Sequence, residues 1–320
     1  MKDRLGRKID YLRVSVTDRC NLRCRYCMPQ SPCFLPEEKL LSLDDFFRLC
    51  SCAARLGIRH LKVAGGEPLV RPGLLPFLGE LKKIPGIESV TLTTNGLLLE
   101  KMLVDLCRLG IDGINISLDT LDESQYRSLT GGGSLLAVLK SLQAAAASPI
   151  PTKINAVLME ETARQIPALA ALAEKMPVDV RFIEMMPIGL GNGMPGVSSD
   201  RALAALKSRW PDLSPTFEKR GSGPARYFGA GGLCGRIGLI DSMSHRFCES
   251  CNRVRLTCTG ILKPCLCFSS GVDLSPLLTC GSDDEIMEAM GRAIFEKPAS
   301  HCFLQPEGKM ETRTMYQIGG

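Results

Sequence analysis

Cys20-Asn21-Leu22-Arg23-Cys24-Arg25-Tyr26-Cys27 is the stretch around which the rest of this 320-residue chain is organised. Its three cysteines have the spacing C-x3-C-x2-C and directly follow a strand-like run. A zinc site usually takes four ligands from paired C-x2-C hooks, whereas three thiolates in one loop suit three corners of a [4Fe–4S] cube. We therefore interpret Cys20, Cys24 and Cys27 as iron–sulfur ligands. The alternatives are a structural zinc knuckle or core cysteines.

Three protein ligands leave one iron of such a cluster open. An open iron can bind a small chelating molecule, and S-adenosylmethionine offers an amino and a carboxylate group for this purpose. The cysteine spacing, followed by Met28-Pro29, resembles the signature of radical S-adenosylmethionine enzymes. In that family the cluster supplies the electron that cleaves S-adenosylmethionine.

Composition is that of a folded protein without a membrane segment. The chain is 45% hydrophobic and carries a net charge of +5, which is spread along the sequence. This charge favours an anionic small molecule weakly and does not suggest nucleic-acid binding. The amino terminus is too charged for a signal peptide and no apolar run is long enough to span a membrane, so we expect a cytoplasmic protein with no membrane partner. In a reducing compartment, clustered cysteines are better explained as ligands than as disulfides.

Strand-like and helix-like segments alternate through the first half of the chain. The predicted strands are Tyr11–Asp18, His60–Glu67, Ser89–Asn95, Gly113–Asp119, Thr152–Met159 and Val178–Met186. The predicted helices are Ser42–Leu56, Leu74–Lys83, Leu98–Leu109, Leu135–Ala147 and Ala163–Lys175. Six such alternations imply parallel strands, and we predict an α/β fold with an incomplete (β/α)6 TIM-like barrel.

Residues with chemical potential collect where these strands end, as expected of a barrel-like active site. They include Cys20, Gly65-Gly66-Glu67, Thr93-Thr94-Asn95, Ser117-Leu118-Asp119 and Glu184-Met185-Met186. From about residue 187 the sequence is linker-like, with one helix at Ser199–Trp210 and a short strand near Ala225–Phe228. We expect a radical S-adenosylmethionine domain over residues 1–235 and a carboxyl-terminal extension over residues 236–320, ending in a helix at Ser282–Glu296 and an irregular tail.

A second group of cysteines lies in that extension. Cys248 and Cys251 form a C-x2-C pair, and thirteen residues separate Cys251 from Cys265 in a region otherwise rich in cysteine. On spacing alone this group could be a zinc site completed by His245. Because the first group already implies iron–sulfur chemistry, we prefer a second [4Fe–4S] cluster with an open iron for a substrate. Cys258 or Cys267 could supply a fourth thiolate and close that site.

Several cations occupy strand-like segments. Arg253 and Arg255 are two residues apart, so in an extended segment both side chains point to one face. Paired guanidinium groups repel unless an anion lies between them, and phosphate matches their geometry. Further cations in strand-like runs would make a barrel interior strongly cationic, which suits a triphosphate; they are Arg13, Lys62, Lys153 and Arg181. The alternative is a series of solvated basic positions.

Further segments of the sequence resemble one particular family within this superfamily. Leu12 to Cys24 together with Tyr26-Cys27-Met28-Pro29, Thr93 to Gly96, Asn115 to Asp119, Arg181 to Glu184 and Phe247 to Thr257 resemble the GTP 3',8-cyclases of molybdenum cofactor biosynthesis. The terminal Gly319-Gly320 agrees as well. The resemblance spans nearly the whole chain. Departures are Lys62 in place of arginine, Ala64 in place of threonine and Thr259 in place of aspartate.

The resemblance implies a role for each matched residue. Cys20, Cys24 and Cys27 would hold the first cluster, and Cys248, Cys251 and Cys265 the second, whose open iron binds guanine in the family. The S-adenosylmethionine site would include Tyr26, Gly66, Ser117 and Met186. The residues contacting GTP would be Arg13, Lys62, Thr93, Lys153, Arg181, Arg253 and Arg255. Catalytic roles would belong to Arg253, Arg255, Gly319 and Gly320.

The family reaction begins when a 5'-deoxyadenosyl radical takes hydrogen from the ribose 3' carbon of GTP, after which that carbon closes onto C8 of guanine. The product, (8S)-3',8-cyclo-7,8-dihydroguanosine 5'-triphosphate, passes to cyclic pyranopterin monophosphate synthase. Flavodoxin or ferredoxin would supply the electron, and a homodimer is compatible with the sequence. Two rivals are a radical enzyme that modifies a peptide and carries auxiliary clusters, and a zinc-binding interaction module without catalysis.

Overall fold

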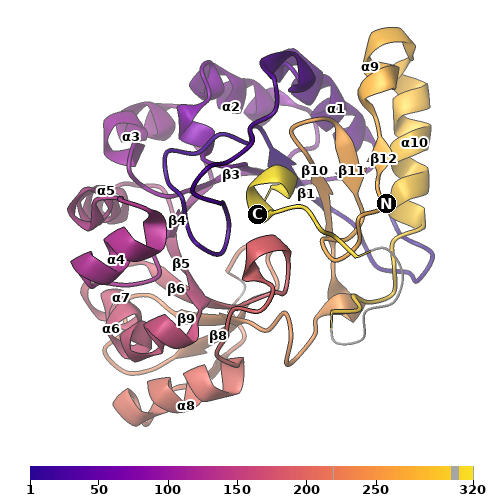
Figure 1. Ribbon diagram of the computed structural model, residues 1–320. Helices are drawn as coiled ribbons and strands as arrows, with labels where there is room; N and C mark the ends of the chain where they lie inside the picture. Colours follow the sequence, from indigo (N-terminus) through magenta and orange to yellow (C-terminus); the bar gives the residue numbers. More distant parts are fainter. Residues whose placement is uncertain (219, 304–309, 320) are drawn as a thin grey trace. The chain divides into compact units, whose positions relative to one another are not determined.

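The computed structural model describes residues 1–218, 220–303 and 310–319. These residues form two compact units, each described by itself. The first consists of Met1–Asn21, Cys27–Thr93 and Cys248–Gly320, and the second of Leu22–Tyr26 and Thr94–Phe247. Figure 1 shows strands followed by helices in both, which confirms the predicted α/β class. The boundary expected near residue 235 stays a prediction.

The first unit is built on a mixed sheet with β1 (Tyr11–Ser15) at its centre. On one side β1 pairs in parallel with β2 (His60–Ala64), which pairs in parallel with β3 (Ser89–Thr94). On the other side β1 pairs in parallel with β10 (Arg253–Leu256), and an antiparallel hairpin follows with β11 (Ile261–Lys263) and β12 (Val272–Asp273). A strand from the carboxyl-terminal segment therefore lies beside the strand that precedes the first cysteines.

Helices cover this sheet through apolar faces. α1 (Leu43–Arg55) begins at a capping box in which Ser42 and Asp45 satisfy each other's backbone amides, and it buries Phe46 and Leu49. It packs against α2 (Leu74–Lys83) and α10 (Asp283–Phe295), and α10 also contacts β11 and β12 (Figure 1). The short helices α9 (Ser275–Cys280) and α11 (Met315–Ile318) complete the unit, with single 3-10 turns at Glu37–Lys39, Pro68–Val70 and Cys248–Ser250.

The second unit has a parallel core of β4 (Gly113–Ser117), β5 (Thr152–Leu158), β6 (Asp179–Glu184) and β9 (Ile237–Ile240). β8 (Arg226–Gly229) and β7 (Ser214–Thr216) extend it as antiparallel strands. Its helices are α3 (Leu99–Arg108), α4 (Glu123–Thr130), α5 (Leu135–Ala147), α6 (Ile166–Ala170), α7 (Leu172–Lys175) and α8 (Ser199–Arg209). 3-10 turns occur at Glu160–Gln165 and Gly189–Gly191.

The predicted elements are present, mostly within one or two residues at each end, and several details differ. The predicted helix Ala163–Lys175 is divided into a 3-10 turn, α6 and α7, because Pro167 fixes a helix start inside it. The sequence reading missed α4, although Asp122 and Gly131 cap it at its two ends. It also missed β7, β9, β11, β12 and the short helix α9, and the tail expected to be irregular contains α11.

Candidate active site

The first cysteine loop leaves the end of β1 and is held in the first unit by a buried acid. Asp18 is fully buried, and its carboxylate accepts hydrogen bonds from Leu35 N at 2.7 Å and from the Arg19 guanidinium at 2.8 Å. Burial, with the neighbouring Cys20 thiol, raises the pKa of Cys27 to about 12. Cys20 and Cys27 are therefore close together in surroundings that do not favour a free thiolate.

Gly66 closes the same strand end. Its N–H donates to Thr17 O at 2.7 Å, and Glu67 N donates to Arg19 O at 2.8 Å. A Cβ atom at Gly66 would lie 2.3 Å from Arg19 O, so no side chain fits there. Packing against the segment that leads to Cys20 is thus enough to require this glycine. Its predicted contact with S-adenosylmethionine stays a prediction.

The middle of the cysteine loop, Leu22–Tyr26, belongs to the second unit and contains Cys24. Its backbone is held by α4, because Arg23 N donates to Thr130 O at 2.8 Å. The Tyr26 hydroxyl donates to Asp119 Oδ2 at 2.8 Å. Burial raises the pKa of Asp119 to about 6, although this hydrogen bond and one from Val157 N oppose the rise.

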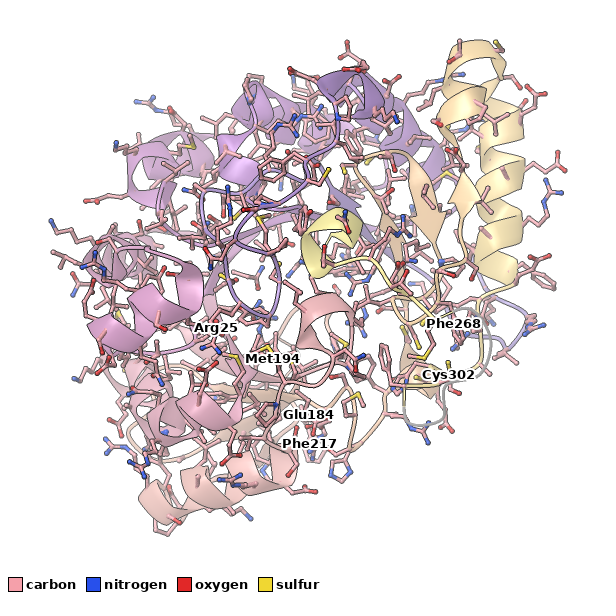
Figure 2. The ribbon with its side chains drawn as sticks, viewed as in Figure 1. Arg25, Glu184, Met194, Phe217, Phe268 and Cys302 are labelled. Atoms are coloured by element: carbon pink, nitrogen blue, oxygen red, sulfur yellow. The ribbon has the colours of Figure 1, made fainter. Side chains whose placement is uncertain are left out.

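The other two residues predicted to bind S-adenosylmethionine also lie in the second unit. Ser117 ends β4, and Met186 follows β6, where its carbonyl accepts from Ile188 N at 2.8 Å. Glu184, which ends β6 (Figure 2), already has hydrogen-bond partners within the protein. Its carboxylate accepts from Ser199 N at 2.8 Å and from Met243 N at 2.7 Å. These bonds lower its pKa in spite of burial. Glu184 therefore braces the loop after β9 and the start of α8.

The second cysteine set lies entirely within the first unit. Cys251 N donates to Cys248 O at 3.2 Å, and the thiols of Cys248 and Cys251 both act electrostatically on Cys265. Burial opposes ionisation of Cys251, but Arg253 and Lys297 outweigh it and lower the pKa of Cys251 to about 7. Among the described residues, no three metal-ligating side chains are gathered closely enough to enclose an ion. The donor set itself, three neighbouring thiols with cations beside them, fits an anionic iron–sulfur cluster.

The alternative ligands named from the sequence have other neighbours. Cys258 is buried beside Asp18 and Arg71, and burial with Asp18 raises its pKa to about 12. The Cys267 thiol lies 3.6 Å from that of Cys302, which Figure 2 shows next to Phe268. His245 belongs to the second unit, where Nε2 is 2.9 Å from Asp200 Oδ1. Each therefore has a structural partner of its own.

Three of the predicted cations form one row across the first sheet. Arg255 on β10 is in register with Arg13 on β1, and Arg13 is in register with Lys62 on β2. Residues directly opposite each other in neighbouring strands point to the same face, so the three positive charges share one side of the sheet. Burial, Arg13 and Arg253 together lower the pKa of Arg255 to about 9. Crowded cations of this kind favour binding of an anion.

Polar side chains on the same face add to this row. Ser15 lies two residues after Arg13, and Thr93 lies two residues after Thr91, the partner of Lys62. Ser15 Oγ and Thr93 Oγ1 are buried and make no hydrogen bond within the described part of the chain. Buried hydroxyls normally find a partner, so both are suited to a polar ligand. The sequence reading missed Ser15, which the alternation of β1 places on the face of Arg13.

The carboxyl-terminal tail reaches this row. Gly319 has φ +77°, and its carbonyl accepts from Arg255 Nη1 at 2.9 Å. A Cβ atom at Gly319 would lie 2.5 Å from Ser15 Cβ, so both the backbone angle and the packing call for glycine. Gly320, to which a catalytic role was also assigned, lies outside the described residues.

The two cations predicted in the second unit are less available. Lys153 Nζ lies 3.0 Å from Asp179 Oδ2 and donates to Tyr227 Oη at 3.0 Å, so an internal carboxylate already accounts for this lysine in a strand. Arg181 is buried, and its guanidinium bonds to Asn115. Its Nε makes no hydrogen bond in the described part of the chain. Contact of either residue with GTP stays a prediction.

Comparisons with known proteins agree with these features. The Radical SAM superfamily model matches residues 14–173, and the Molybdenum Cofactor Synthesis C model matches residues 178–303. A protein of Clostridium perfringens named GTP 3',8-cyclase is 42% identical over 100% of both chains. The chain belongs to the GTP 3',8-cyclase family. Family members so named from Heliobacterium modesticaldum and Geobacter sulfurreducens are 41% and 40% identical over at least 99% of both chains.

Solved structures support the fold. Streptococcus suis SuiB bound to S-adenosylmethionine matches with a TM-score of 0.65 and 15% identity over 90% of this chain and 68% of that one. SuiB bound to its precursor peptide SuiA matches with a TM-score of 0.66 and 13% identity over 97% of this chain and 76% of that one. The radical S-adenosylmethionine fold predicted from the cysteine loop is thereby confirmed. In the part of the chain that the structure describes, no helix has the length and apolar character needed to span a membrane.

Proposed function

We propose that this chain is a radical S-adenosylmethionine enzyme that converts GTP to (8S)-3',8-cyclo-7,8-dihydroguanosine 5'-triphosphate, in the first step of molybdenum cofactor biosynthesis. Identity of about 40% over the full length of relatives named GTP 3',8-cyclase supports this proposal. The structural observation that carries it is the row of Arg255, Arg13 and Lys62, which lies in the same unit as the second cysteine set.

The described residues suggest how GTP would be held. The triphosphate would bind the cation row, because guanidinium groups match phosphate oxygens in geometry and charge. The hydroxyls of Ser15 and Thr93 would satisfy further polar atoms. Cys248, Cys251 and Cys265 would hold a second [4Fe–4S] cluster against which the guanine base rests. Fixing both ends of GTP leaves the ribose as the part exposed to the radical.

The first cysteine set would hold the cluster that supplies the electron for cleavage of S-adenosylmethionine. Tyr26, Gly66, Ser117 and Met186 would line the site of S-adenosylmethionine. Gly319 would keep the Arg255 guanidinium oriented through its carbonyl. Lys153 and Arg181 would join the nucleotide site if the Asp179 ion pair and the Asn115 hydrogen bond exchange for substrate contacts.

We further propose the partners that this reaction requires. A low-potential carrier such as flavodoxin or ferredoxin would deliver the electron, and cyclic pyranopterin monophosphate synthase would take the product. We place the protein in the cytoplasm, and a homodimer is compatible with its sequence.

The proposal is tested by anaerobic incubation of reconstituted protein with S-adenosylmethionine, dithionite and GTP. We expect 5'-deoxyadenosine and a new cyclic nucleotide to appear together, in equal amounts. Cys24→Ala is the matched control and should form neither product. Formation of 5'-deoxyadenosine without consumption of GTP would overturn the cyclase assignment and favour a peptide substrate.

A further inference from the structure

Two buried cations tie together the three segments that carry the second cysteine set. Arg7 is 8% exposed, and both terminal nitrogens of its guanidinium donate hydrogen bonds to backbone carbonyls. Nη1 donates to Cys248 O at 2.8 Å and to Ala299 O at 3.0 Å, while Nη2 donates to Pro298 O at 2.7 Å. Arg7 therefore fixes the backbone of the first cysteine in the set to the segment after α10.

Lys297 holds the other two cysteines in the same way. Its side chain is buried, with 3% of the residue exposed. Nζ donates to Arg253 O at 2.9 Å, two residues after Cys251, and to Pro264 O, directly before Cys265. Arg7 Nη2 also donates to Lys297 O at 3.2 Å, which connects the two braces. Each of the three cysteines thus has a buried cation bonded to its own carbonyl or to one close by.

The two cations differ in how their charge is balanced. Arg7 Nε lies 2.6 Å from Asp3 Oδ2, and Asp3 also accepts from Arg7 N at 2.9 Å, so this brace is neutral as a pair. The acceptors of Lys297 are carbonyl groups, and across residues 1–218, 220–303 and 310–319 no carboxylate forms an ion pair with it. Burying an ammonium group without a counter-charge is costly.

A third buried cation shows what a charge-balanced site looks like. Lys263 is completely buried, and its ammonium forms an ion pair with the equally buried Glu311, which also pairs with Arg313 at 2.9 Å. Lys297 is bonded instead to the carbonyls of Arg253 and Pro264, which lie two residues after Cys251 and directly before Cys265. The negative charge that would balance Lys297 is therefore that of the thiolates and of the cluster they hold.

We propose that Lys297 is a positioning residue that supplies the unbalanced positive charge of the second cluster site, so that it stabilises the reduced cluster, while Arg7 acts as a charge-neutral brace of the same site. This inference rests on the second cluster of the proposed function. A cluster held by three thiolates is anionic and gains one more negative charge on reduction, so a nearby buried cation raises its reduction potential. Because Lys297 is bonded to fixed carbonyls, it cannot turn away from the site.

The experiment isolates the second set by replacing Cys20, Cys24 and Cys27 with Ala. The full chain is reconstituted anaerobically with iron and sulfide, and iron content, the electron paramagnetic resonance signal and the midpoint potential are measured. In Lys297→Met and Lys297→Gln we expect the ratio of reduced to oxidised cluster at a fixed potential to fall by about tenfold, which equals a shift of about 59 mV to lower potential. The matched control, Arg7→Met with Asp3→Asn, removes one charge of each sign and should lower iron content while changing that ratio less than twofold.

The outcomes separate this inference from the function it rests on. If the cluster forms and its potential is the same in both Lys297 variants as in the parent, the inference fails and the proposed function stands. If the parent with an intact second set binds no cluster, the two-cluster proposal and the inference fail together. Loss of folding in both Lys297 variants, judged by circular dichroism, would also overturn the inference, because the ammonium would then belong to the core of the protein itself.

Discussion

The first cysteine loop and the second cysteine set contain equal numbers of thiols but are braced by opposite charges. Carboxylates hold the first: Asp18 fixes the strand end before Cys20, and Asp119 binds Tyr26 inside the motif. Cations hold the second, through Arg7 and Lys297. The thiols of the two sets also differ. Burial and the neighbouring Cys20 raise the pKa of Cys27 to about 12, whereas Arg253 and Lys297 outweigh burial and lower the pKa of Cys251 to about 7.

This contrast suits two different tasks. Nearby positive charge stabilises a reduced, more anionic cluster, so the first site should be the stronger reductant of the two. A strong reductant is needed where an electron must cleave S-adenosylmethionine. The second site, set beside the row of cations, is better suited to hold an anionic substrate than to deliver an electron.

The largest expected effect comes from removing one ligand from each set. Cys24→Ala should abolish both 5'-deoxyadenosine and cyclic nucleotide, because the electron path is lost. Cys265→Ala should abolish the cyclic nucleotide while 5'-deoxyadenosine still forms, since only the anchor of the substrate is lost. Chromatography of both products under anaerobic conditions measures this. Equal loss of the two products in Cys265→Ala would contradict the assignment of electron delivery to the first set and substrate anchoring to the second.

The cation row should show the next largest effect. Arg13→Ala and Arg255→Ala each remove a charge-assisted contact, which corresponds to a rise in the Kd for GTP of roughly 10- to 100-fold. Isothermal titration of GTP without S-adenosylmethionine measures this change, and higher salt should reduce it. Lys101→Ala, an exposed lysine on α3, is the control and should leave the Kd unchanged. An unchanged Kd in both arginine variants would remove the row from the substrate site.

Stability at low pH tests the ion pair that anchors the tail beside the second set. Hydrogen bonds from Arg313 and Lys263 lower the pKa of Glu311 to about 2 in spite of burial. Burial also lowers the pKa of Lys263 despite this carboxylate. The ion pair therefore stabilises the folded chain by less than the shift of Glu311 alone suggests. A depressed carboxyl pKa gives stability that is present above the unfolded value of 4.5 and is lost as pH falls from there towards 2.

Glu311→Gln should therefore lower the free energy of unfolding at pH 6 by roughly 3 kcal/mol, with the difference from the parent shrinking as pH falls through that window. Urea unfolding of the metal-free chain under reducing conditions measures it. Glu288→Gln, which removes an exposed carboxylate of α10, is the control and should change little. A difference that does not vary with pH would show that Glu311 acts through packing alone.

Much of the fold could be predicted because local patterns carry it. The alternation of apolar residues gave β1 to β6, and capping residues such as Ser42 and Ser282 fixed where helices begin. The pairing of β10 with β1 could not be predicted, because it joins strands about 240 residues apart and depends on no local signal. That pairing is what turns Arg13, Lys62 and Arg255 from separate strand cations into one row.

The site was predictable where residue type and spacing decide the chemistry, as in both cysteine sets. It was not predictable where a distant partner decides the role of a residue. Lys153 resembles a substrate contact in the sequence but has Asp179 as a partner in the neighbouring strand. Arg7 and Lys297 belong to a charged amino terminus and a helix end in the sequence, and only the folded chain brings them to the second cysteine set.

The smallest expected effect concerns the acid that braces the first motif. Burial raises the pKa of Asp119 from its ordinary 3.8 to about 6, so the buried carboxylate costs stability once it ionises. With a raised carboxyl pKa, the unfolded chain releases its proton first, and stability should fall by roughly 2 kcal/mol as pH rises from about 4 to about 6. Asp119→Asn should flatten this part of the profile, as urea unfolding of the metal-free chain at several pH values would measure.

Tyr26→Phe sharpens this last test. The Tyr26 hydroxyl donates to the ionised form of Asp119, so its removal should raise the pKa further and move the decline to higher pH. A profile for Asp119→Asn that parallels the parent would mean that Asp119 ionises freely and does not brace the loop as a buried acid. The contrast between carboxylates at the first motif and cations at the second would then depend on Asp18 alone. The carboxylate oxygens of Asp18 already accept hydrogen bonds from Leu35 N and the Arg19 guanidinium.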